Sequence, residues 1–400
     1  AKLLFGKKDN KISYFLTFME NYNLIMACGT HHWNIRAIAI FFPQGFEMRH
    51  MIQKFGMGVL QRLEPELSHN LALLVLRSKL YPIIKPGHYQ RLSTKLAGMQ
   101  LTNPVGLAAG FDKNATALEA ITKIGFGFAE IGAVTPQPQH GNKRPRVFRL
   151  PEEEAIINHF GFNNHGMEKI NKRLAKYHGK CLIGLNIGAN RASSDIKSDF
   201  YQVLKKCADN INFATINISS PNTKNLRELQ KGNQLDELLS QIIIHCPKTF
   251  KTKPIFVKIA PDLEITDLET IANVCAKYNI SGIIATNTSN NSRILENPAK
   301  YIQGGISGRP LFSKSTKILA QLSKITEGEI PLIGVGGIYS GEDAYLKICA
   351  GASAVQLYTA LTYKGPTLID TILKDLDRLL EINGYKTVEE AVGTKRQEFI

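Results

Sequence analysis

The stretch FATINISSPNT (213–223) decides the fold of this chain. A hydrophobic run, FATINI (213–218), ends abruptly in two serines, a proline and an asparagine. Pro221 lacks the backbone N–H that a strand needs, so the ladder stops just after the hydroxyl of Ser220. This pattern is typical of a buried strand that ends at a reaction site whose neutral donors and acceptors suit a planar polar heterocycle. An ordinary polar turn is the alternative on these residues alone.

Seven further apolar, β-branched runs resemble this one, and helix-like segments separate most of them. The runs are 105–109, 128–132, 181–188, 255–260, 282–286, 331–337 and 354–359, and the helical segments include 235–244, 265–278, 314–325 and 341–350. Near-continuous apolar strands that alternate with helices indicate a parallel sheet covered by helices. Eight such units predict an α/β fold, a (β/α)₈ TIM barrel. A doubly wound open sheet is the alternative, but no GxGxxG follows the first run.

The composition and the charge of the chain narrow the possible classes of protein and of binding partner. Of the 400 residues 44% are hydrophobic, and no run reaches the roughly 18 apolar residues of a membrane span. The six cysteines lie apart, without a CxxC or paired histidines, which predicts free thiols and no metal site. The net charge is +15, and residues 1–100 hold 13 basic against 5 acidic residues. This excess of basic residues favours a membrane surface as the partner. Nucleic acid is disfavoured, because no basic stripe with interleaved aromatics is present. A generally basic proteome is the alternative explanation of the charge.

Three segments are predicted along the chain. Residues 1–50 form an extension of weak order, and residues 51–82 form a helical module that either packs on the main domain or serves membrane contact and ligand entry. Two apolar helices are expected in this module, with a break at Glu64-Pro65 and Pro65 at the start of the second. Residues 83–400 form the barrel domain.

The carboxyl ends of the strands carry polar residues that should converge, because that is where TIM barrels place their active sites. These ends hold Lys113, Asn186, Asn217, Ser220, Lys258, Thr286, Asn287, Thr288, Tyr358 and Thr359. The segments 334–344 and 304–308 predict two glycine-rich loops whose backbone N–H groups bind a phosphate. Together these features predict a cofactor that carries phosphate.

Two lysines are candidate ligand contacts. Lys258 lies in the otherwise apolar run IFVKIA (255–260), where an unsatisfied charge is costly, so we expect it to face a ligand. Snorkelling from the strand end is the alternative for Lys258. Lys113 either contacts the ligand or pairs with Asp112 at the surface.

Proton transfer at this site falls to Ser220. No histidine or cysteine lies in the cluster, and its carboxylates are Asp112 and Asp262, which argues against a Ser-His-Asp hydrolase and against a metal centre. A serine is a weak base, but it can serve if the proton becomes more acidic as a hydride leaves the neighbouring carbon. The site therefore predicts a redox partner such as a flavin.

Long motifs in a fixed order identify a family. They are NPVGLAAGFDKN (103–114), the segment 125–166, NISSPNT (217–223), KIAPDL (258–263), ATNTS (285–289), GGISGRPL (304–311), IGVGGIYSGEDA (333–344) and GASAVQLYTAL (351–361). Over residues 51–395 the chain resembles the class 2, quinone-dependent dihydroorotate dehydrogenases. The resemblance implies an FMN enzyme that oxidises (S)-dihydroorotate to orotate in pyrimidine (UMP) biosynthesis and returns its electrons to a ubiquinone-type membrane quinone. A class 1-like enzyme that uses fumarate or NAD, and a non-catalytic flavin-binding barrel, are the alternatives; class 1 enzymes use Cys where this chain has Ser220.

The resemblance also implies roles for individual residues. Ser220 is the implied base, which takes the C5 proton while a hydride passes from C6 to the flavin. The implied substrate contacts are Lys113, Asn158, Phe162, Asn217, Asn222, Asn287 and Thr288. The implied flavin contacts are Ala108, Ala109, Gly110, Lys113, Asn186, Asn217, Lys258, Thr286, Ser307, Gly308, Gly337, Tyr358 and Thr359. The implied quinone tunnel is lined by His69, Arg149, Tyr358 and Thr362.

Some positions depart from the family pattern. Ala133 stands where the family usually has Ser or Thr, and Leu60 stands where some relatives have a polar tunnel residue, so one flavin contact and the quinone contacts are expected to differ. Residues 1–50 match nothing in the family. The expected protein is a monomer that binds the cytoplasmic face of a bacterial inner membrane through its N-terminal helices. Because the extension makes a poor transit peptide, the mitochondrial inner membrane is the alternative.

Overall fold

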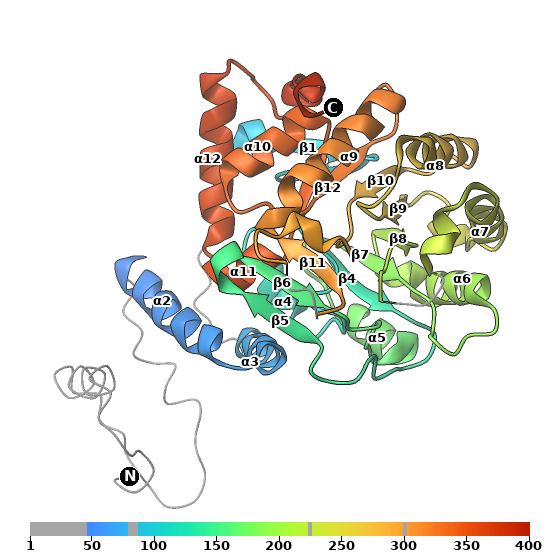
Figure 1. The fold of residues 1–400 in the computed structure, drawn as a ribbon, viewed down its shortest axis with the longest axis horizontal. Coiled ribbons are helices and arrows are strands. Elements are labelled where there is room, and N and C mark those ends of the chain that lie inside the picture. Colours follow the sequence, from blue (N-terminus) through green and yellow to red (C-terminus); the bar gives the residue numbers. More distant parts are fainter. Residues whose placement is uncertain (1–45, 79–86, 223–225, 299–301) are drawn as a thin grey trace, which may run out of the picture. The chain divides into compact units, whose positions relative to one another are not determined.

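Eight parallel strands close into a barrel, as the sequence predicts (Figure 1). The computed structural model describes residues 46–78, 87–222, 226–298 and 302–400. Around the barrel the strand order is β10-β12-β13-β3-β4-β7-β8-β9, and β9 pairs with β10 to complete the ring. The strands are β3 (Val105–Leu107), β4 (Phe128–Val134), β7 (Leu182–Ile187), β8 (Phe213–Asn217), β9 (Ile255–Ile259), β10 (Gly282–Ala285), β12 (Leu332–Val335) and β13 (Ala354–Leu357). Each lies within one of the eight predicted runs or overlaps it, so the TIM barrel prediction is confirmed.

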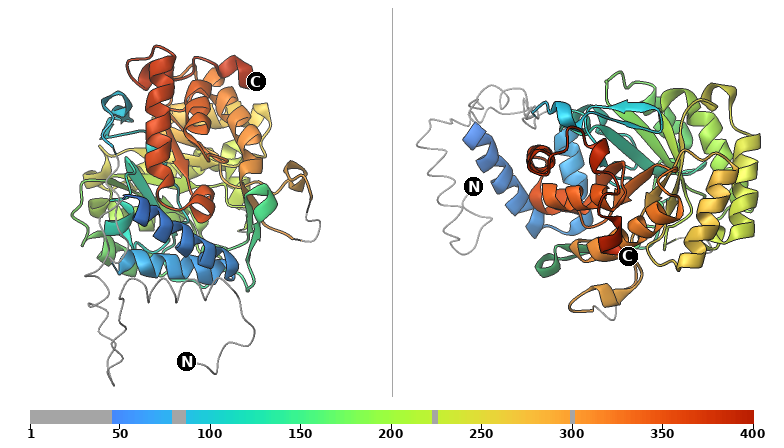
Figure 2. Two further views of the ribbon diagram at one scale, coloured as in Figure 1. Left: turned by 90° about the vertical axis from the view of Figure 1, so that its left-hand side faces the viewer. Right: turned by 90° about the horizontal axis from the view of Figure 1, so that it is seen from above.

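Helices cover the outside of the barrel (Figures 1 and 2). They are α4 (Leu118–Ile121), α5 (Gly166–Leu174), α6 (Ile196–Cys207), α7 (Gly232–Ile244), α8 (Ile265–Lys277), α9 (Phe312–Ile325), α10 (Gly341–Ala350), α11 (Thr359–Lys364) and α12 (Leu368–Ile382). Their apolar stripes face the strands: in α8, for example, Leu268, Ile271 and Cys275 are fully buried. This is the spacing of an amphipathic helix that covers a sheet.

The barrel interior is apolar at its amino end and polar toward its carboxyl end. Phenylalanines from three strands fill the amino end: Phe128, Phe213 and Phe256. Alternate residues of a barrel strand face the interior, so Glu130 and Lys258, two positions further along β4 and β9, lie one layer higher. Both are buried. The strand geometry thus places two charged side chains, Glu130 and Lys258, inside the barrel toward its carboxyl end.

A β-hairpin closes the amino end of the barrel and was not predicted. It consists of β1 (Thr94–Leu96) and β2 (Met99–Leu101). Ala97 and Gly98 between them have φ of 47° and 81°, the two left-handed positions of a type I′ turn. Leu96 and Leu101 pack on the apolar barrel end. Strands of this length give too little alternation to be recognised in a sequence.

A small antiparallel sheet stands beside the carboxyl ends of the barrel strands. It contains β5 (Val147–Leu150), β6 (Ala155–Asn158) and β11 (Gly305–Gly308) in the order β11-β6-β5. The prediction of a glycine-rich loop at 304–308 was wrong, because this segment is a strand paired with β6. A Cβ at Gly308, where φ is 103°, would collide with the carbonyl oxygen of Glu154, so this glycine permits close backbone approach.

Two N-terminal helices lie side by side against the barrel, α2 (Phe46–Arg62) and α3 (Pro65–Arg77) (Figures 1 and 2). The predicted break is confirmed: Pro65 begins α3, and the Glu64 carboxylate accepts hydrogen bonds from the first free N–H groups of that helix. Helix α2 begins before the expected position, Met51. Most of the predicted extension, residues 1–50, lies outside the described residues. No helix in the described segments has the length and apolarity needed to cross a bilayer.

Polar contacts attach these helices to the barrel. The Gln53 amide donates to the carbonyl of Lys364 at 3.0 Å. The Glu66 carboxylate, 7% exposed, accepts from the Arg146 guanidinium at 2.7 and 3.0 Å. Burial opposes the charge of Glu66, but Arg146 and Arg144 outweigh it and hold the pKa of Glu66 below its ordinary value. A buried, paired carboxylate of this kind fixes one position of α3 on the barrel.

Candidate active site

One cavity of about 580 Å³ begins at the carboxyl ends of the strands and continues beneath α2 and α3. Every residue to which the resemblance assigns a substrate, flavin, quinone or catalytic role lines it, whereas Asp112 and Asp262 do not. The lining residues with such a role are His69, Ala108, Ala109, Gly110, Lys113, Arg149, Asn158, Phe162, Asn186, Asn217, Ser220, Asn222, Lys258, Thr286, Asn287, Thr288, Ser307, Gly308, Gly337, Tyr358, Thr359 and Thr362. The convergence expected from a barrel is therefore present, although lining a cavity does not assign a role to any one residue.

Ser220 lies on the cavity wall just after β8. Its residue surface is 5% exposed, and its hydroxyl oxygen accepts a hydrogen bond from the Asn222 backbone N–H at 3.3 Å. No basic side chain in the described part of the chain is hydrogen-bonded to it. The Asn222 amide in turn donates to the backbone and side-chain oxygens of Asn158, at 3.1 and 3.3 Å. The serine is thus held in place without a base of its own.

A chain of side-chain amides crosses the floor of the cavity from one buried carboxylate. Glu130 accepts from the Asn186 amide at 2.7 Å. The oxygen of Asn186 accepts from the Asn217 amide at 2.8 Å. The oxygen of Asn217 then faces Ser219 and the Asn287 amide, at 3.2 and 3.4 Å. Because a carboxylate accepts but does not donate, Glu130 fixes which end of each amide faces which neighbour.

Sequence reasoning missed Glu130 and Gln356. Glu130 is fully buried and also accepts from the Gln356 amide at 2.7 Å, so one carboxylate joins strands β4, β7 and β13. A signal was present, since Glu130 stands alone in the apolar run FAEIG (128–132) just as Lys258 does in IFVKIA. The same argument about a charge in a buried strand applies to both residues.

Lys113 reaches into the cavity. Its ammonium donates to the carbonyl of Gly110 at 2.8 Å and lies 3.9 Å from the centre of the Phe160 ring. Burial lowers the pKa of Lys113 to about 8. The alternative of a surface pair with Asp112 is wrong, because Asp112 is fully buried and its carboxylate accepts from the backbone N–H groups that follow it.

Lys258 is buried beneath the cavity, so snorkelling to solvent is excluded. Burial lowers its pKa, and the negative charge of Glu130 partly opposes that effect. Within the described residues its ammonium has no hydrogen-bond acceptor, although the residue lines the cavity. A buried donor without a partner favours a ligand that brings one.

The opposite part of the cavity is suited to an anion. At Gly337, φ is 76° and a Cβ would lie 2.6 Å from the backbone nitrogen of Phe312, so only glycine fits there without strain. The backbone N–H groups of Gly337, Tyr358 and Thr359 have no acceptor in the described part of the chain. The Thr359 hydroxyl donates to the Ser307 hydroxyl at 2.9 Å, which links β11 to this region. Free N–H groups around a glycine bend can bind phosphate oxygens.

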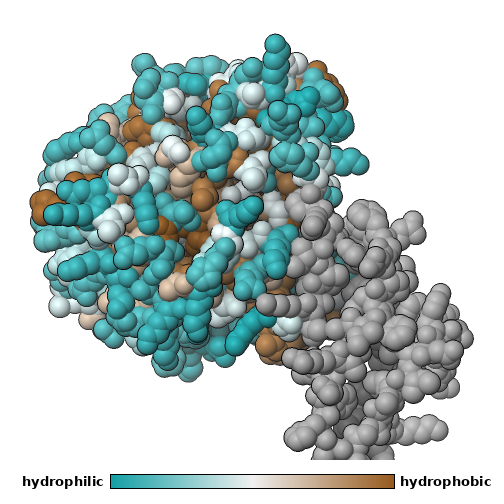
Figure 3. Space-filling model, turned by 180° about the vertical axis from the view of Figure 1, so that it is seen from behind, coloured by the Kyte–Doolittle hydropathy of each residue, from teal (hydrophilic) through white to brown (hydrophobic). Residues whose placement is uncertain are grey.

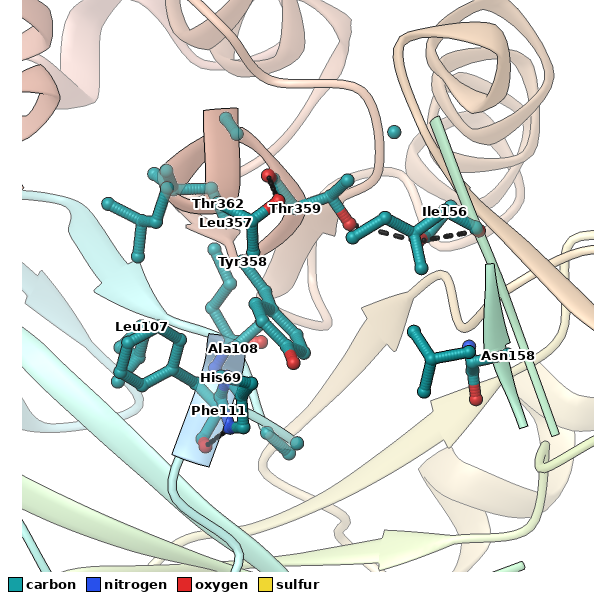
Figure 4. A pocket seen from close by; sticks show the side chains of 18 of the residues that line it. His69, Leu107, Ala108, Phe111, Ile156, Asn158, Leu357, Tyr358, Thr359 and Thr362 are labelled. Atoms are coloured by element: carbon teal, nitrogen blue, oxygen red, sulfur yellow. Dashed lines mark hydrogen bonds between the residues drawn. The ribbon is translucent and has the colours of Figure 1, made fainter. Parts of the chain in front are cut away.

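An aromatic cluster lies where helix α3 meets the ends of strands β3 and β13. Figure 4 shows His69, Phe111 and Tyr358 together on one side of the cavity and Asn158 on the other. The His69 ring nitrogen lies 2.8 Å from the carbonyl oxygen of Phe111, and burial lowers the pKa of His69 to about 4. His69 is therefore neutral near pH 7. Arg149 donates to the carbonyl oxygen of Leu63 at 2.8 Å, which places this cation at the end of α2.

The outer faces of α2 and α3 are apolar and exposed. The exposed residues include Phe55, Val59, Leu67, Leu71, Leu74 and Val75, with 37% to 58% of their surface accessible. Several of them also line the mouth of the cavity. The face seen from behind is mostly hydrophilic with small apolar patches (Figure 3). A concentrated apolar patch beside a cavity marks a contact site for another apolar surface.

Asp262 is one of the two carboxylates that the sequence predicts near the site. In the structure it connects the loops around the site through ion pairs. Its carboxylate pairs with Arg227 at 3.1 Å and with Lys314 at 2.6 Å. Arg227 also donates to the carbonyl of Thr288 at 2.9 Å and to that of Ser219 at 3.3 Å. Arg227 and Lys314 were not predicted. Across residues 46–78, 87–222, 226–298 and 302–400, no group of three His, Cys, Asp or Glu side chains could hold a metal ion.

Comparisons with known proteins agree with this geometry. A family model described as dihydroorotate dehydrogenase matches residues 91–380. A dihydroorotate dehydrogenase (quinone) of Cereibacter sphaeroides is 49% identical over 351 residues, which cover 88% of this chain and 99% of that protein. A dihydroorotate dehydrogenase (quinone), mitochondrial, of Mus musculus is 42% identical and covers 86% of this chain and 90% of that protein.

A solved structure gives the same result for the fold. The crystal structure of DHODH in complex with ferulenol from Eimeria tenella superposes with a TM-score of 0.80 at 35% identity, covering 86% of this chain and 99% of that one. Dihydroorotate dehydrogenases are flavin enzymes, which fits a cavity with an unpaired buried ammonium at one end and free backbone N–H groups at the other. By the match of the family model and by the identity to its relatives, the chain belongs to the dihydroorotate dehydrogenase family.

Proposed function

We propose that this protein oxidises dihydroorotate to orotate in pyrimidine biosynthesis, with FMN as its cofactor and a ubiquinone-type quinone as its electron acceptor. The observation that carries the proposal is the convergence of Ser220, Lys113 and the amide side chains on one cavity in a chain of this family. The substrate is an amide heterocycle with one carboxylate, and its oxidation gives a planar ring; both match neutral hydrogen-bonding groups and one ammonium.

FMN fits the residues that line the cavity. Lys258 supplies a buried ammonium for the electron-rich edge of the ring system, and Gly337, Tyr358 and Thr359 supply free N–H groups for the phosphate. When bound, FMN supplies a two-electron acceptor for the substrate and a donor for the quinone. Ala133, which carries no hydroxyl, leaves this pocket one side-chain donor short of the usual family pattern.

Ser220 is the proposed base. In the reaction the C6–H bond breaks with its electron pair, which bound FMN would accept as a hydride. The C5 proton goes to the Ser220 oxygen as this hydroxyl passes its own proton on to water, and a C5–C6 double bond forms. Serine is a weak base, and it suffices because loss of the hydride makes the C5 proton more acidic. The buried position of Ser220 keeps bulk water away from this proton.

The remaining polar residues hold the substrate. Lys113 is the proposed partner of its carboxylate, and Asn158, Phe162, Asn217, Asn222, Asn287 and Thr288 are the proposed contacts of its ring. Glu130 supports this set, since it fixes the donor and acceptor ends of Asn186 and Asn217. An amide that faced the wrong way would oppose a donor to a donor, so this control of orientation favours one substrate pose.

Quinone is proposed to approach from the helical pair. His69, Arg149, Tyr358 and Thr362 line the cavity on that side, and the exposed apolar residues of α2 and α3 surround its mouth. We propose that these helices lie on a membrane surface, from which an apolar quinone can enter the cavity. The cytoplasmic face of a bacterial inner membrane is the proposed location, with the mitochondrial inner membrane as the alternative, and the protein is proposed to act as a monomer.

Two measurements test the proposal. The cofactor released from the purified protein should have the mass of FMN and should not be FAD or riboflavin. Steady-state oxidation of dihydroorotate should then proceed with a soluble ubiquinone analogue and not with fumarate or NAD. Turnover with fumarate or NAD instead of the quinone would favour the class 1-like alternative, and FMN without any turnover would favour a non-catalytic flavin protein.

A further inference from the structure

A buried lysine behind the cavity has no part in the chemistry described above. Lys347, on α10, is fully buried. Its ammonium donates to the hydroxyls of Ser315 and Thr316, both at 2.9 Å, and lies 4.9 Å from the centre of the Phe312 ring. In the described part of the chain no carboxylate lies within ion-pair distance of it. A buried cation without a close counter-charge is costly unless some anion offsets it.

The environment of Lys347 opposes its charge. Burial lowers the pKa of Lys347 to about 7, and the charge of Asp343 only partly offsets this effect. The Asp343 carboxylate already accepts a hydrogen bond from the backbone N–H of Tyr339. The backbone N–H of Asp343 donates to the Ser340 hydroxyl at the start of α10. A further negative charge close to Lys347 would therefore stabilise its protonated form.

One of the two hydroxyls leads from Lys347 to the cavity. The Ser315 hydroxyl has two carbonyl oxygens in reach, Phe312 at 3.1 Å and Gly336 at 3.2 Å. The Phe312 carbonyl already accepts from the Thr316 hydroxyl at 2.6 Å. A hydroxyl has one proton to donate. The carbonyl of Gly336 has no other donor among the described residues, so Ser315 satisfies an otherwise unpaired acceptor when it donates there.

The Gly336–Gly337 peptide extends this series of hydrogen bonds from Ser315 to the cavity. The carbonyl of Gly336 and the N–H of Gly337 belong to the same peptide group, and this N–H has no acceptor among the described residues. Each donor in the series, from Lys347 through Ser315 to Gly337, points in the same direction. Hydrogen bonds aligned in this way polarise one another, by roughly 10–30% per bond. The positive end of the series is the free N–H group on the cavity wall.

We propose that Lys347 is a positioning residue and counter-charge for the phosphate of the flavin cofactor, coupled to it through Ser315 and the Gly336–Gly337 peptide. The inference rests on the proposed function, since it takes the phosphate to bind at Gly337. It predicts that Lys347 contributes to binding of FMN and not to binding of riboflavin, which has the same ring system without the phosphate. A lysine that only filled space in the core would affect both flavins alike.

The experiment compares the two flavins on the apoprotein. Flavin is removed from the purified full-length protein, and dissociation constants for FMN and riboflavin are measured by quenching of flavin fluorescence. In Lys347→Met the dissociation constant for FMN should rise about ten-fold, about 1.4 kcal/mol, with that for riboflavin unchanged. Ser315→Ala, which keeps the lysine but interrupts the series, should weaken FMN binding in the same selective way.

Two control variants separate this role from a general loss of packing. Thr316→Val removes the other hydroxyl that binds Lys347 but leaves the series intact, so it should weaken FMN binding less than Ser315→Ala does. Lys253→Met removes a lysine that donates to two carbonyl oxygens, at 2.7 Å each, outside this region, and should change neither affinity.

The outcomes are distinct. An equal loss of FMN and riboflavin affinity in Lys347→Met, an unchanged preference for FMN, or a Thr316→Val effect as large as that of Ser315→Ala would overturn the inference. If Lys347→Met does not fold, Ser315→Ala decides by the same criterion. If the unaltered apoprotein binds FMN no better than riboflavin, the proposed function fails instead, because these loops then hold no phosphate.

Discussion

The protonation of Lys113 should control the binding of orotate. Its ammonium is the proposed partner of the substrate carboxylate, and burial lowers its pKa to about 8. The carboxylate binds the charged form of the lysine, and the neutral form predominates above that pH. Orotate affinity should therefore be constant below pH 7 and fall about ten-fold for each pH unit well above 8.

The assay is a titration of the oxidised protein with orotate, followed through the change in the flavin spectrum between pH 6 and 10. The His69 ring, with a pKa of about 4, stays neutral across this range. Lys258 also has a lowered pKa, so Lys113→Met provides the control: it should bind orotate weakly at every pH and lose the pH dependence. A flat profile for the unaltered protein from pH 7 to 10, or the same slope in Lys113→Met, would refute the assignment.

Three further perturbations follow from the structure. Ser220→Ala should slow reduction of the flavin by dihydroorotate about 10²–10⁴-fold with FMN still bound, measured by stopped flow; an unchanged rate at neutral pH would remove Ser220 from the mechanism. Glu66→Gln leaves Arg146 buried without its partner and should lower the free energy of unfolding by about 3–5 kcal/mol in urea, whereas Glu228→Gln, which breaks an exposed pair with Lys231, should have little effect. The folded pKa of Glu66 is lowered, so its contribution is present above pH 4.5 and lost as the pH falls through the folded value; equal stability of the Glu66→Gln variant and the parent at pH 7 would contradict this. Replacing Phe55, Leu67 and Leu74 by serine should abolish sedimentation with anionic lipid vesicles while flavin reduction persists, and undiminished vesicle binding would rule out this apolar face as the contact.

The barrel could be predicted from the sequence because its strands are buried on both faces. Runs such as IFVKIA (255–260) and FATINI (213–218) are apolar at most positions on both faces, and helices with a regular stripe separate them. The short hairpin of β1 and β2 could not be recognised, because three residues per strand give almost no periodicity. The segment 304–308 was mistaken for a loop because its glycines serve close approach to β6, and glycine alone does not separate that use from a turn.

The site was partly predictable for a related reason. Residues at strand ends must converge in a barrel, so Lys113, Asn217 and Lys258 could be found by position alone. Glu130 stands alone in an apolar run as Lys258 does, but its partners could not be predicted, because they lie on strands far apart in the sequence. Lys347 gave no signal, since a lysine in an amphipathic helix is expected on the solvent face. Its burial follows from how α10 packs on α9 and α12, which only the tertiary structure shows.

The oxidation of dihydroorotate is tested most directly by the reaction of the purified, FMN-loaded protein with dihydroorotate in the absence of oxygen. The flavin absorption band should bleach, and a ubiquinone analogue should restore it, while fumarate and NAD should not. Bleaching that fumarate or NAD reverses would contradict the assignment of the acceptor. An FMN-loaded sample that does not bleach at all would contradict the central claim that this cavity oxidises dihydroorotate.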